Sequence, residues 1–223
     1  MLIIAIDGPA GSGKTTVGRM VAEALGFALV DTGLFYRALT VEARRRGIGA
    51  GDVEGLTKML GEVRIQLNTS PSTGRAGPLV MIDGRDVSQQ AHDPAIAGEL
   101  SQISQIPEVR RLLVEAQRRA ASGDAVVLGR DIGTVIFPDA DAKFFFTAPA
   151  AERVARRRRE LDQARGSATP DALLEQEIEA RDRADQERET APLRPAADAI
   201  IVATEDKSVR QVFDEVMARL PKH

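Results

Sequence analysis

The sequence predicts a three-layer α/β sandwich, in which a parallel five-stranded sheet lies between layers of helices. Three observations lead to this prediction: five short runs are mostly apolar, helical periodicity separates most of them, and a glycine-rich turn directly follows the first run. Strands that are covered on both faces are apolar throughout, whereas half-exposed strands alternate. The expected strands are residues 2–6, 27–30, 125–128, 143–148 and 199–202.

The expected helices have apolar residues on one face and end near glycine, a common helix terminator. The first follows the glycine-rich turn and ends at Gly26, and the second covers about 34–46 and ends at Gly47. Further helices are expected over 94–104, from 107 towards Gly123, and over 151–165, 171–188 and 209–220. Strands and helices in this order are typical of an α/β protein with a parallel sheet.

Residues 63–87 have a different pattern and predict a small antiparallel β insert. Residues 63–67 alternate between apolar and polar side chains, as in a half-buried strand. Residues 69–78 are rich in Ser, Thr, Gly and Pro and predict a loop, and 79–82 predict the returning strand. Asp83-Gly84 is a tight-turn signal immediately after it.

Composition excludes several classes of protein. The 223 residues carry a net charge of -3, which argues against a general nucleic-acid binder, and include no cysteine for a disulfide or thiolate metal site. Two isolated histidines cannot build a zinc site, and no apolar run approaches the roughly 20 residues that cross a bilayer. The N-terminus has no signal-peptide pattern, so a cytoplasmic protein is expected.

The segment 8–15 reads G-P-A-G-S-G-K-T and matches the phosphate-binding loop G-x-x-x-x-G-K-[ST]. An apolar strand precedes it and an amphipathic helix follows, which is the context that the motif requires. Backbone N–H groups and the helix N-terminus face the phosphates, while Lys14 reaches the β- and γ-phosphates and the Thr15 hydroxyl is a Mg²⁺ ligand. The expected ATP contacts are Gly8, Pro9, Ala10, Gly11, Ser12, Gly13, Lys14, Thr15 and Thr16.

The loop alone does not say which class of P-loop protein this is. The base-reading N-K-x-D of a GTPase is absent, and the chain is short for a motor or transporter ATPase. Of its basic residues 25 are arginine and 5 are lysine, and arginine suits bidentate recognition of phosphate. Most of these arginines fit solvated helix faces, but small size and abundant arginine favour a kinase of small metabolites.

Three further segments, taken with the loop, resemble the bacterial cytidylate kinase family. They are D-T-G-L-F-Y-R at 31–37, G-R-D-I-G-T-V-I-F-P at 129–138 and R-D-R-A-D-Q-E-R at 181–188. The second string is specific, whereas many nucleotide kinases share the loop. The resemblance runs nearly end to end and includes the β insert. One departure is Thr15-Thr16, where some relatives have glycine after the lysine.

The resemblance implies a (d)CMP kinase that transfers the γ-phosphoryl group of ATP to CMP or dCMP, with Mg²⁺ bridging the phosphates. Its partners would be these small molecules, without nucleic acid or membrane, and the protein would be a monomer. One domain is implied, with a core of about 1–60, 105–150 and 190–223. An NMP-binding insert would cover about 61–104 and a helical lid region about 151–189.

The resemblance also assigns roles to single residues. Lys14, Arg130 and Arg188 would be catalytic. The CMP contacts would be Thr32, Arg37, Ser101, Arg110, Arg130, Asp131, Arg181, Asp185 and Arg188. Within this set, Arg37, Arg130 and Arg188 would bind phosphate, Arg181 and Asp185 the sugar, and Ser101, Arg110 and Asp131 the cytosine.

Spacing alone leaves plainer interpretations open for some of these residues. Arg181, Asp185 and Arg188 share one helix face, which is equally compatible with a solvated row of ion pairs. Arg37 has the position of a surface helix arginine. Asp131 lies at the carboxyl end of an expected strand, where open α/β sheets bind ligands, but an aspartate there could also cap a helix or accept a hydrogen bond behind Mg²⁺.

The run Arg156-Arg157-Arg158-Arg159 suggests a mobile lid beside the ATP phosphates, with one or two arginines pointing inward; the sequence does not say which. An RNA-binding module would also use such a run, but consecutive residues point around a helix and few aromatic residues are present for base stacking. The P-loop is also compatible with a kinase of AMP, dTMP or shikimate on the same scaffold, or with a nucleotide-dependent regulator. The β insert and the string at 129–138 argue against the first of these, and the charged region 151–190 argues against the second.

Overall fold

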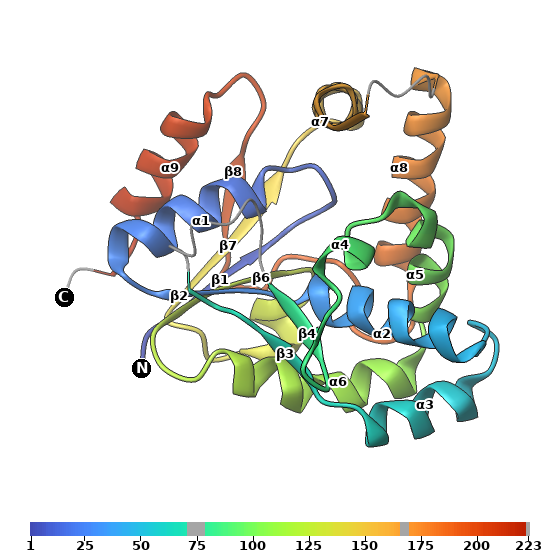
Figure 1. Cartoon of the computed structure of the whole chain (residues 1–223). Helices are drawn as coiled ribbons and strands as arrows, with labels where there is room; N and C mark the ends of the chain where they lie inside the picture. The colour runs from blue at the N-terminus through green and yellow to red at the C-terminus, as the bar shows by residue number, and fades with distance from the viewer. Residues whose placement is uncertain (71–78, 166–169, 222–223) are drawn as a thin grey trace.

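The computed structural model describes residues 1–70, 79–165 and 170–221. Its centre is a five-stranded sheet in the order β2-β6-β1-β7-β8, and every neighbouring pair is parallel (Figure 1). The strands are β1 (Ile3–Asp7), β2 (Ala28–Asp31), β6 (Ala125–Gly129), β7 (Ala142–Thr147) and β8 (Ile200–Ala203). The expected parallel five-stranded sheet is therefore confirmed, and each strand end lies within one residue of the one predicted.

Helices cover both faces of the sheet, as the alternate residues of β1 show. Ile4 and Ile6 pack with α1 (Lys14–Leu25) and α9 (Val209–Ala218), whereas Ile3 and Ala5 pack on the opposite side, against α6 (Pro107–Ala120) and a π-helical turn, η2 (Ile132–Ile136). Successive side chains of a strand point to opposite faces, so a strand in this position must be apolar throughout. Figure 1 shows α1 and α9 on one side of the sheet and α6 on the other.

The strand register brings the loops of interest to one edge of the sheet. Asp7 at the end of β1 pairs with Gly129 at the end of β6, and Asp31 at the end of β2 pairs with Leu128. The segments that follow these three strands therefore leave the sheet side by side. Open α/β sheets bind ligands at this carboxyl edge.

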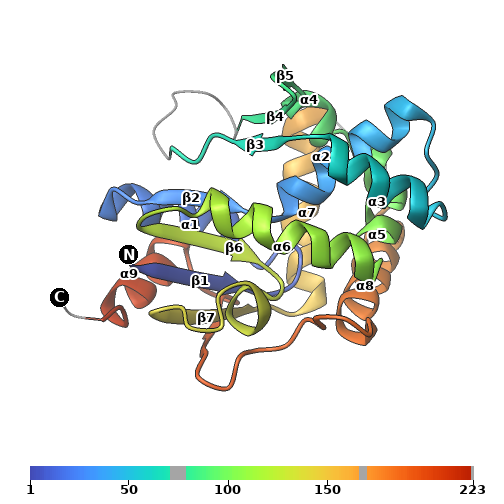
Figure 2. The ribbon, with the colours of Figure 1, turned by 90° about the horizontal axis from the view of Figure 1, so that it is seen from below.

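The insert has one more strand than the sequence predicts. The strands β3 (Ile65–Leu67), β4 (Val80–Ile82) and β5 (Arg85–Asp86) form an antiparallel sheet that lies apart from the parallel one (Figure 2). Asp83 and Gly84 both have positive φ, 49° and 78°, as a two-residue hairpin turn requires. The predicted turn thus leads directly into β5. Most of the expected loop, 71–78, lies outside the described residues.

The remaining helices include one that the sequence pattern does not predict. This is α3 (Val53–Glu62), which follows α2 (Gly33–Arg46) and begins where the Asp52 carboxylate accepts a hydrogen bond from the Gly55 amide at 2.8 Å. The single helix expected over 94–104 is divided into a short turn, η1 (Pro94–Ile96), and α5 (Ala97–Ile103), preceded by α4 (Ser88–Ala91).

The expected lid region consists of two helices, α7 (Ala150–Arg165) and α8 (Asp171–Glu187). They pack through Val154, Leu174 and Ile178, which form a small apolar cluster separate from the sheet. The connection at 166–169 lies outside the described residues. Within the described ranges, no helix is both long and apolar enough to cross a membrane.

Candidate active site

The phosphate-binding loop joins β1 to α1 and depends on backbone conformations that favour glycine. Gly8 has φ 145°, and a Cβ there would lie 2.4 Å from the carbonyl oxygen of Phe146. Gly13 has φ 90° and precedes α1 without a side-chain cap, and the first turn of α1 has no acidic residue. The free backbone amides at the start of α1 therefore have no carboxylate of their own helix as an acceptor. They are available to bind an anion in the loop.

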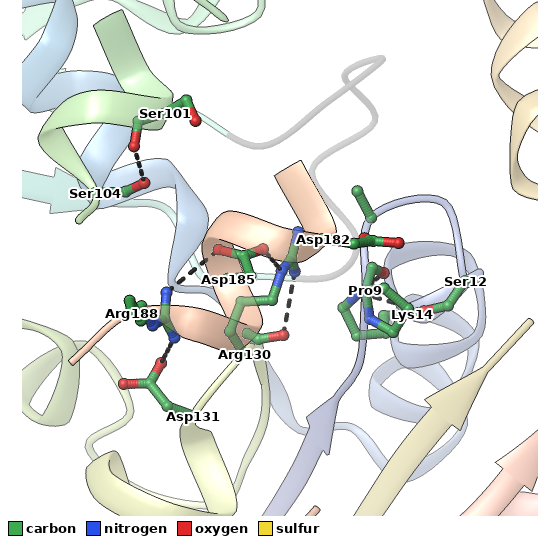
Figure 3. Close-up of polar contacts among 12 residues, drawn as sticks. Pro9, Ser12, Lys14, Ser101, Ser104, Arg130, Asp131, Asp182, Asp185 and Arg188 are labelled. Carbon is green, nitrogen blue, oxygen red and sulfur yellow. Dashed lines mark hydrogen bonds and ion pairs between the residues drawn. The ribbon is translucent and has the colours of Figure 1, made fainter. Parts of the chain in front are cut away.

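Lys14 is buried at the mouth of this loop. Its Nζ donates to the Pro9 carbonyl at 2.6 Å and to Ser12 Oγ at 3.3 Å (Figure 3). Burial, and then the positive charge of Arg130, hold the pKa of the Lys14 ammonium well below its usual range. An anion that entered the loop would offset both effects.

A second group of charged residues lies at the end of β6. Arg130 Nε donates to Asp185 at 2.9 Å, and Arg188 Nη1 donates to the other oxygen of Asp185 at 3.3 Å. Arg110 Nη2 donates to Asp131 at 2.6 Å, and Arg188 Nη2 lies 3.8 Å from Asp131 (Figure 3 shows Arg130, Asp131, Asp185 and Arg188). The structure thus brings together five sequence-predicted site residues from α6, from the segment after β6, and from the C-terminal end of α8.

The positive charge of this region exceeds what its carboxylates balance. Burial, and then the charge of Arg130, lower the pKa of Arg181 to about 10, although Asp185 opposes the effect. Burial also lowers the pKa of Arg37, whose Nη1 donates to the Ala91 carbonyl at 2.8 Å. Kinases need such charge to hold two phosphorylated substrates close together.

The four consecutive arginines of α7 have different surroundings. The positive charge of Arg157 contributes to the lowered pKa of both Arg37 and Arg181, so Arg157 lies near these two arginines. Arg156 instead contacts the phosphate loop and Thr204, while Arg158 pairs with Asp171 at 2.5 Å. Arg159 donates to the Ala155 carbonyl on its own helix.

Two side-chain nitrogens near Asp131 are hydrogen-bond donors that have no acceptor among the described residues. The Arg110 guanidinium stands 5.4 Å from the centroid of the Tyr36 ring, and burial raises the pKa of Tyr36. Arg110 Nε and Arg188 Nη2 are buried and have no hydrogen-bond partner among the described residues. Buried donors without partners are rare, and next to a carboxylate they suit a ligand with both acceptors and donors.

The other predicted residues lie around this centre. Ser101 is on α5, apart from the Arg130–Asp185–Arg188 group in Figure 3; its carbonyl accepts from Ser104 Oγ, and the Ser104 carbonyl accepts from Arg110. The Thr32 hydroxyl is buried and donates to the Leu128 carbonyl at 2.8 Å, so it is free only to accept. Thr15 and Thr16 are exposed on the first turn of α1.

Asp7 is a part of the site that the sequence pattern does not single out. Its two carboxylate oxygens accept from the amides of Ile132 and Gly133, both at 2.8 Å, and so hold the turn η2 that follows Asp131. Burial raises the pKa of Asp7 to about 6. The available signal was an aspartate at the end of a strand that is otherwise wholly apolar.

A Mg²⁺ site made by the protein alone is not found in the described residues, where no group of three or more His, Cys, Asp or Glu could hold a metal ion. Mg²⁺ in phosphoryl-transfer sites usually takes one or two protein ligands and completes its shell with phosphates and water. The exposed Thr15 hydroxyl beside the phosphate loop fits that arrangement.

Comparisons with known proteins show which family this chain resembles. The sequence model of the family described as cytidylate kinase matches residues 4–222. The cytidylate kinase of Pelotomaculum thermopropionicum is 43% identical over 218 residues, covering 97% of this chain and 95% of that protein. The cytidylate kinase of Caldanaerobacter subterraneus subsp. tengcongensis is 42% identical, covering 99% and 95%. A bifunctional pantoate ligase/cytidylate kinase of Synechococcus sp. (strain JA-3-3Ab) is 43% identical, covering 96% of this chain and 40% of that protein.

Proposed function

The chain belongs to the cytidylate kinase family, and we propose that it transfers the γ-phosphoryl group of ATP to CMP or dCMP, giving ADP and CDP or dCDP. The observation that carries this proposal is the juxtaposition of two charged groups at one sheet edge. The phosphate loop with Lys14 lies on one side, and Arg130 with its partners on α8 lies on the other. Burial, and then the charge of Arg130, lower the pKa of Lys14, so the two groups are close enough to interact.

On the donor side, residues 8–16 bind the ATP phosphates. The loop amides and the start of α1 contact the β-phosphate, and Lys14 reaches across to the γ-phosphate. Thr15 would be the protein ligand of Mg²⁺, which would supply further charge neutralisation. The low pKa of Lys14 returns towards normal when a phosphate replaces the carbonyl of Pro9 as its partner.

On the acceptor side, the phosphate of CMP and the γ-phosphoryl group that is transferred to it are bound by Arg37, Arg130 and Arg188. Arg181 and Asp185 contact the sugar, and Ser101, Arg110 and Asp131 contact the cytosine edge, while Thr32 lines the site through its acceptor oxygen. The unpartnered donors of Arg110 and Arg188 beside the Asp131 carboxylate support a base with acceptors and an amino group. The acceptor phosphate is already an oxyanion, so positioning and charge neutralisation suffice for the chemistry.

The domain division expected from the sequence is kept as part of this proposal. The core of about 1–60, 105–150 and 190–223 carries the loop and Asp131, the insert of about 61–104 carries Ser101, and the lid region of about 151–189 carries Arg157. Of the four consecutive arginines, Arg157 is the one that we place beside the phosphates. The cytoplasmic location and the monomeric state stay predictions from the sequence.

The test is an ADP-release assay with ATP and Mg²⁺, in which CMP, dCMP, UMP, AMP, GMP and dTMP are offered in turn. We expect turnover with CMP and dCMP, much weaker turnover with UMP and none with AMP. In Arg110→Met the KM for CMP should rise at least tenfold with little change in the KM for ATP, because this arginine donates to Asp131, and we place both residues at the cytosine. Preference for another monophosphate, or silence with all six, would overturn the proposal.

A further inference from the structure

Four consecutive carbonyl groups of the phosphate loop each accept a hydrogen bond from a side chain. The pairs are Pro9 with Lys14 at 2.6 Å, Ala10 with Arg153 at 3.2 Å, Gly11 with Arg156 at 3.3 Å, and Ser12 with Thr204 at 3.2 Å. Three of these donors come from outside the loop: two from α7 and one from the segment after β8.

These bonds matter because of what the loop must do with its amides. A loop that binds phosphate turns successive N–H groups inward, and its carbonyl groups then face the protein. A carbonyl in a partly buried position needs a partner, because leaving it unpaired costs on the order of 1–3 kcal/mol. Donors on the outer side therefore favour the one loop conformation in which the amides point at the ligand.

Thr204 is the best placed of the three external donors. It is 2% exposed, and its backbone amide donates to the Thr147 carbonyl at 2.9 Å, which extends the pairing of β7 and β8. Its Oγ1 accepts from Arg156 Nη1 at 3.0 Å and lies 3.2 Å from the Ser12 carbonyl and 3.1 Å from the Thr147 carbonyl. Because Arg156 donates to the oxygen, the single hydroxyl proton is left for these two carbonyls, which share it.

Arg156 is held by several contacts at the same place. Its Nη2 donates to the Thr204 carbonyl at 2.7 Å and to Glu152 at 2.5 Å, and its Nη1 also reaches the Gly11 carbonyl. A Cβ on Gly13 would lie 3.7 Å from this Nη1, so the guanidinium stands against the left-handed end of the loop. Arg156 thus supports both Thr204 and the loop.

We propose that Thr204 and Arg156 are positioning residues, which hold the phosphate loop in its binding conformation from outside and so set the affinity for the triphosphate of ATP. The proposal rests on the kinase function proposed above. Arg153 also reaches the loop, at Ala10, but its ion pair with Asp182 on α8 would mix two effects in any substitution. The test therefore uses Thr204 and Arg156.

The principal variant is Thr204→Val, which keeps the side-chain shape and removes the hydroxyl. We expect the KM for ATP, and the Kd for Mg-ATP measured by calorimetry without CMP, to rise about tenfold, the equivalent of ~1.4 kcal/mol. The KM for CMP and the kcat at saturating ATP should change less than twofold. Thr204→Ser, which keeps the hydroxyl, should restore ATP affinity, and Arg156→Met should reproduce the defect.

Matched controls are Thr57→Val and Arg210→Met. The Thr57 hydroxyl donates within α3, and Arg210 pairs with Asp214 on the exposed face of α9. Both controls should leave both KM values unchanged. They remove the same chemical groups, so they separate the loop effect from a general effect of the substitution.

A purely structural role would lower the melting temperature and raise both KM values together, and that result would overturn the proposal. An unchanged affinity for ATP in Thr204→Val would also overturn it. If Thr204→Val does not fold, Arg156→Met gives the same ratio of the two KM values. Failure of the wild-type protein to phosphorylate CMP or dCMP would refute the proposed function instead, and calorimetry with Mg-ATP would still test Thr204 and Arg156.

Discussion

Replacing Arg181 by methionine should stabilise the protein and at the same time abolish most of its activity. Arg181 lies on α8, partly buried, and no described residue forms a hydrogen bond or an ion pair with it. Burial and the charge of Arg130 lower its pKa to about 10. Methionine keeps a long apolar stem and removes the charge.

The magnitude follows from the pKa. A guanidinium whose pKa falls to about 10 costs ~3 kcal/mol relative to a solvated one, at about 1.4 kcal/mol for each pH unit. The folded pKa is lower than the unfolded pKa, so the whole cost is present below pH 10 and is relieved only as pH rises above it. Because the side chain is partly exposed, we discount the gain in Arg181→Met to about 1–2 kcal/mol at pH 7.5.

The assay pairs urea unfolding without nucleotide with steady-state kinetics. The free energy of unfolding should rise, whereas kcat/KM for CMP should fall by roughly two to three orders of magnitude, because the variant loses an active-site arginine that we place at the sugar of the acceptor. Arg183→Met is the matched control, because Arg183 is exposed on the same helix, and it should change neither quantity. A variant that is destabilised by more than 1 kcal/mol would show that the charge of Arg181 is balanced in the free protein. A variant that keeps full turnover would show that Arg181 does not contact the substrate.

Three shorter predictions concern other charged and conformational features. Burial raises the pKa of Asp7 to about 6, so its ionised form costs stability above pH 6 and the cost is relieved as pH falls; Asp7→Asn should therefore gain about 2 kcal/mol relative to wild type on going from pH 4.5 to pH 8 in urea unfolding. Hydrogen bonds from arginines lower the pKa of Glu42 to about 2, so its contribution is lost as pH falls from 4.5 towards 2; Glu42→Gln should cost about 2 kcal/mol at pH 7, less at pH 3, with the KM for ATP unchanged. Gly8→Ala should raise the KM for ATP about 100-fold in initial-rate assays, because the added Cβ would lie 2.4 Å from the Phe146 carbonyl oxygen and displace the loop.

The sheet and the loop could be predicted because their signals are local. A strand such as β1, buried on both faces, must be apolar along its whole length, and the loop needs glycine at fixed positions. The helix α3 carries two glycines and buries only Leu56 and Met59, so its own sequence favours helix weakly and packing against α6 contributes to its stability. The two residues of β5 are exposed and have no apolar pattern, and the turn at Asp83-Gly84 aligns them with β4.

The sequence predicts individual site residues better than it predicts the contacts between them. Arg181, Asp185 and Arg188 could be placed on one helix face from their spacing, but the spacing equally suited a surface row of ion pairs. Only the tertiary arrangement shows Asp185 between Arg130 and Arg188, 55 and 3 residues away. The contact of Thr204 with Ser12 spans 192 residues and depends on β8 ending beside β7, which no local pattern encodes.

The same arginine-rich composition has opposite electrostatic outcomes in two parts of the molecule. At the end of α2 one buried carboxylate, Glu42, accepts hydrogen bonds from three arginines: Arg45, Arg46 and Arg85. Water screens these partly exposed arginines, so their excess charge costs little. At the active site Asp131 and Asp185 each contact two arginines, and burial lowers the pKa of Arg37 and Arg181 beside them. Positive charge that is buried and left in excess costs stability in the free protein, and a phosphate dianion is the kind of ligand that balances it. Arginines of this second kind are therefore the ones whose removal should weaken substrate binding, whereas removal of the first kind should change stability alone.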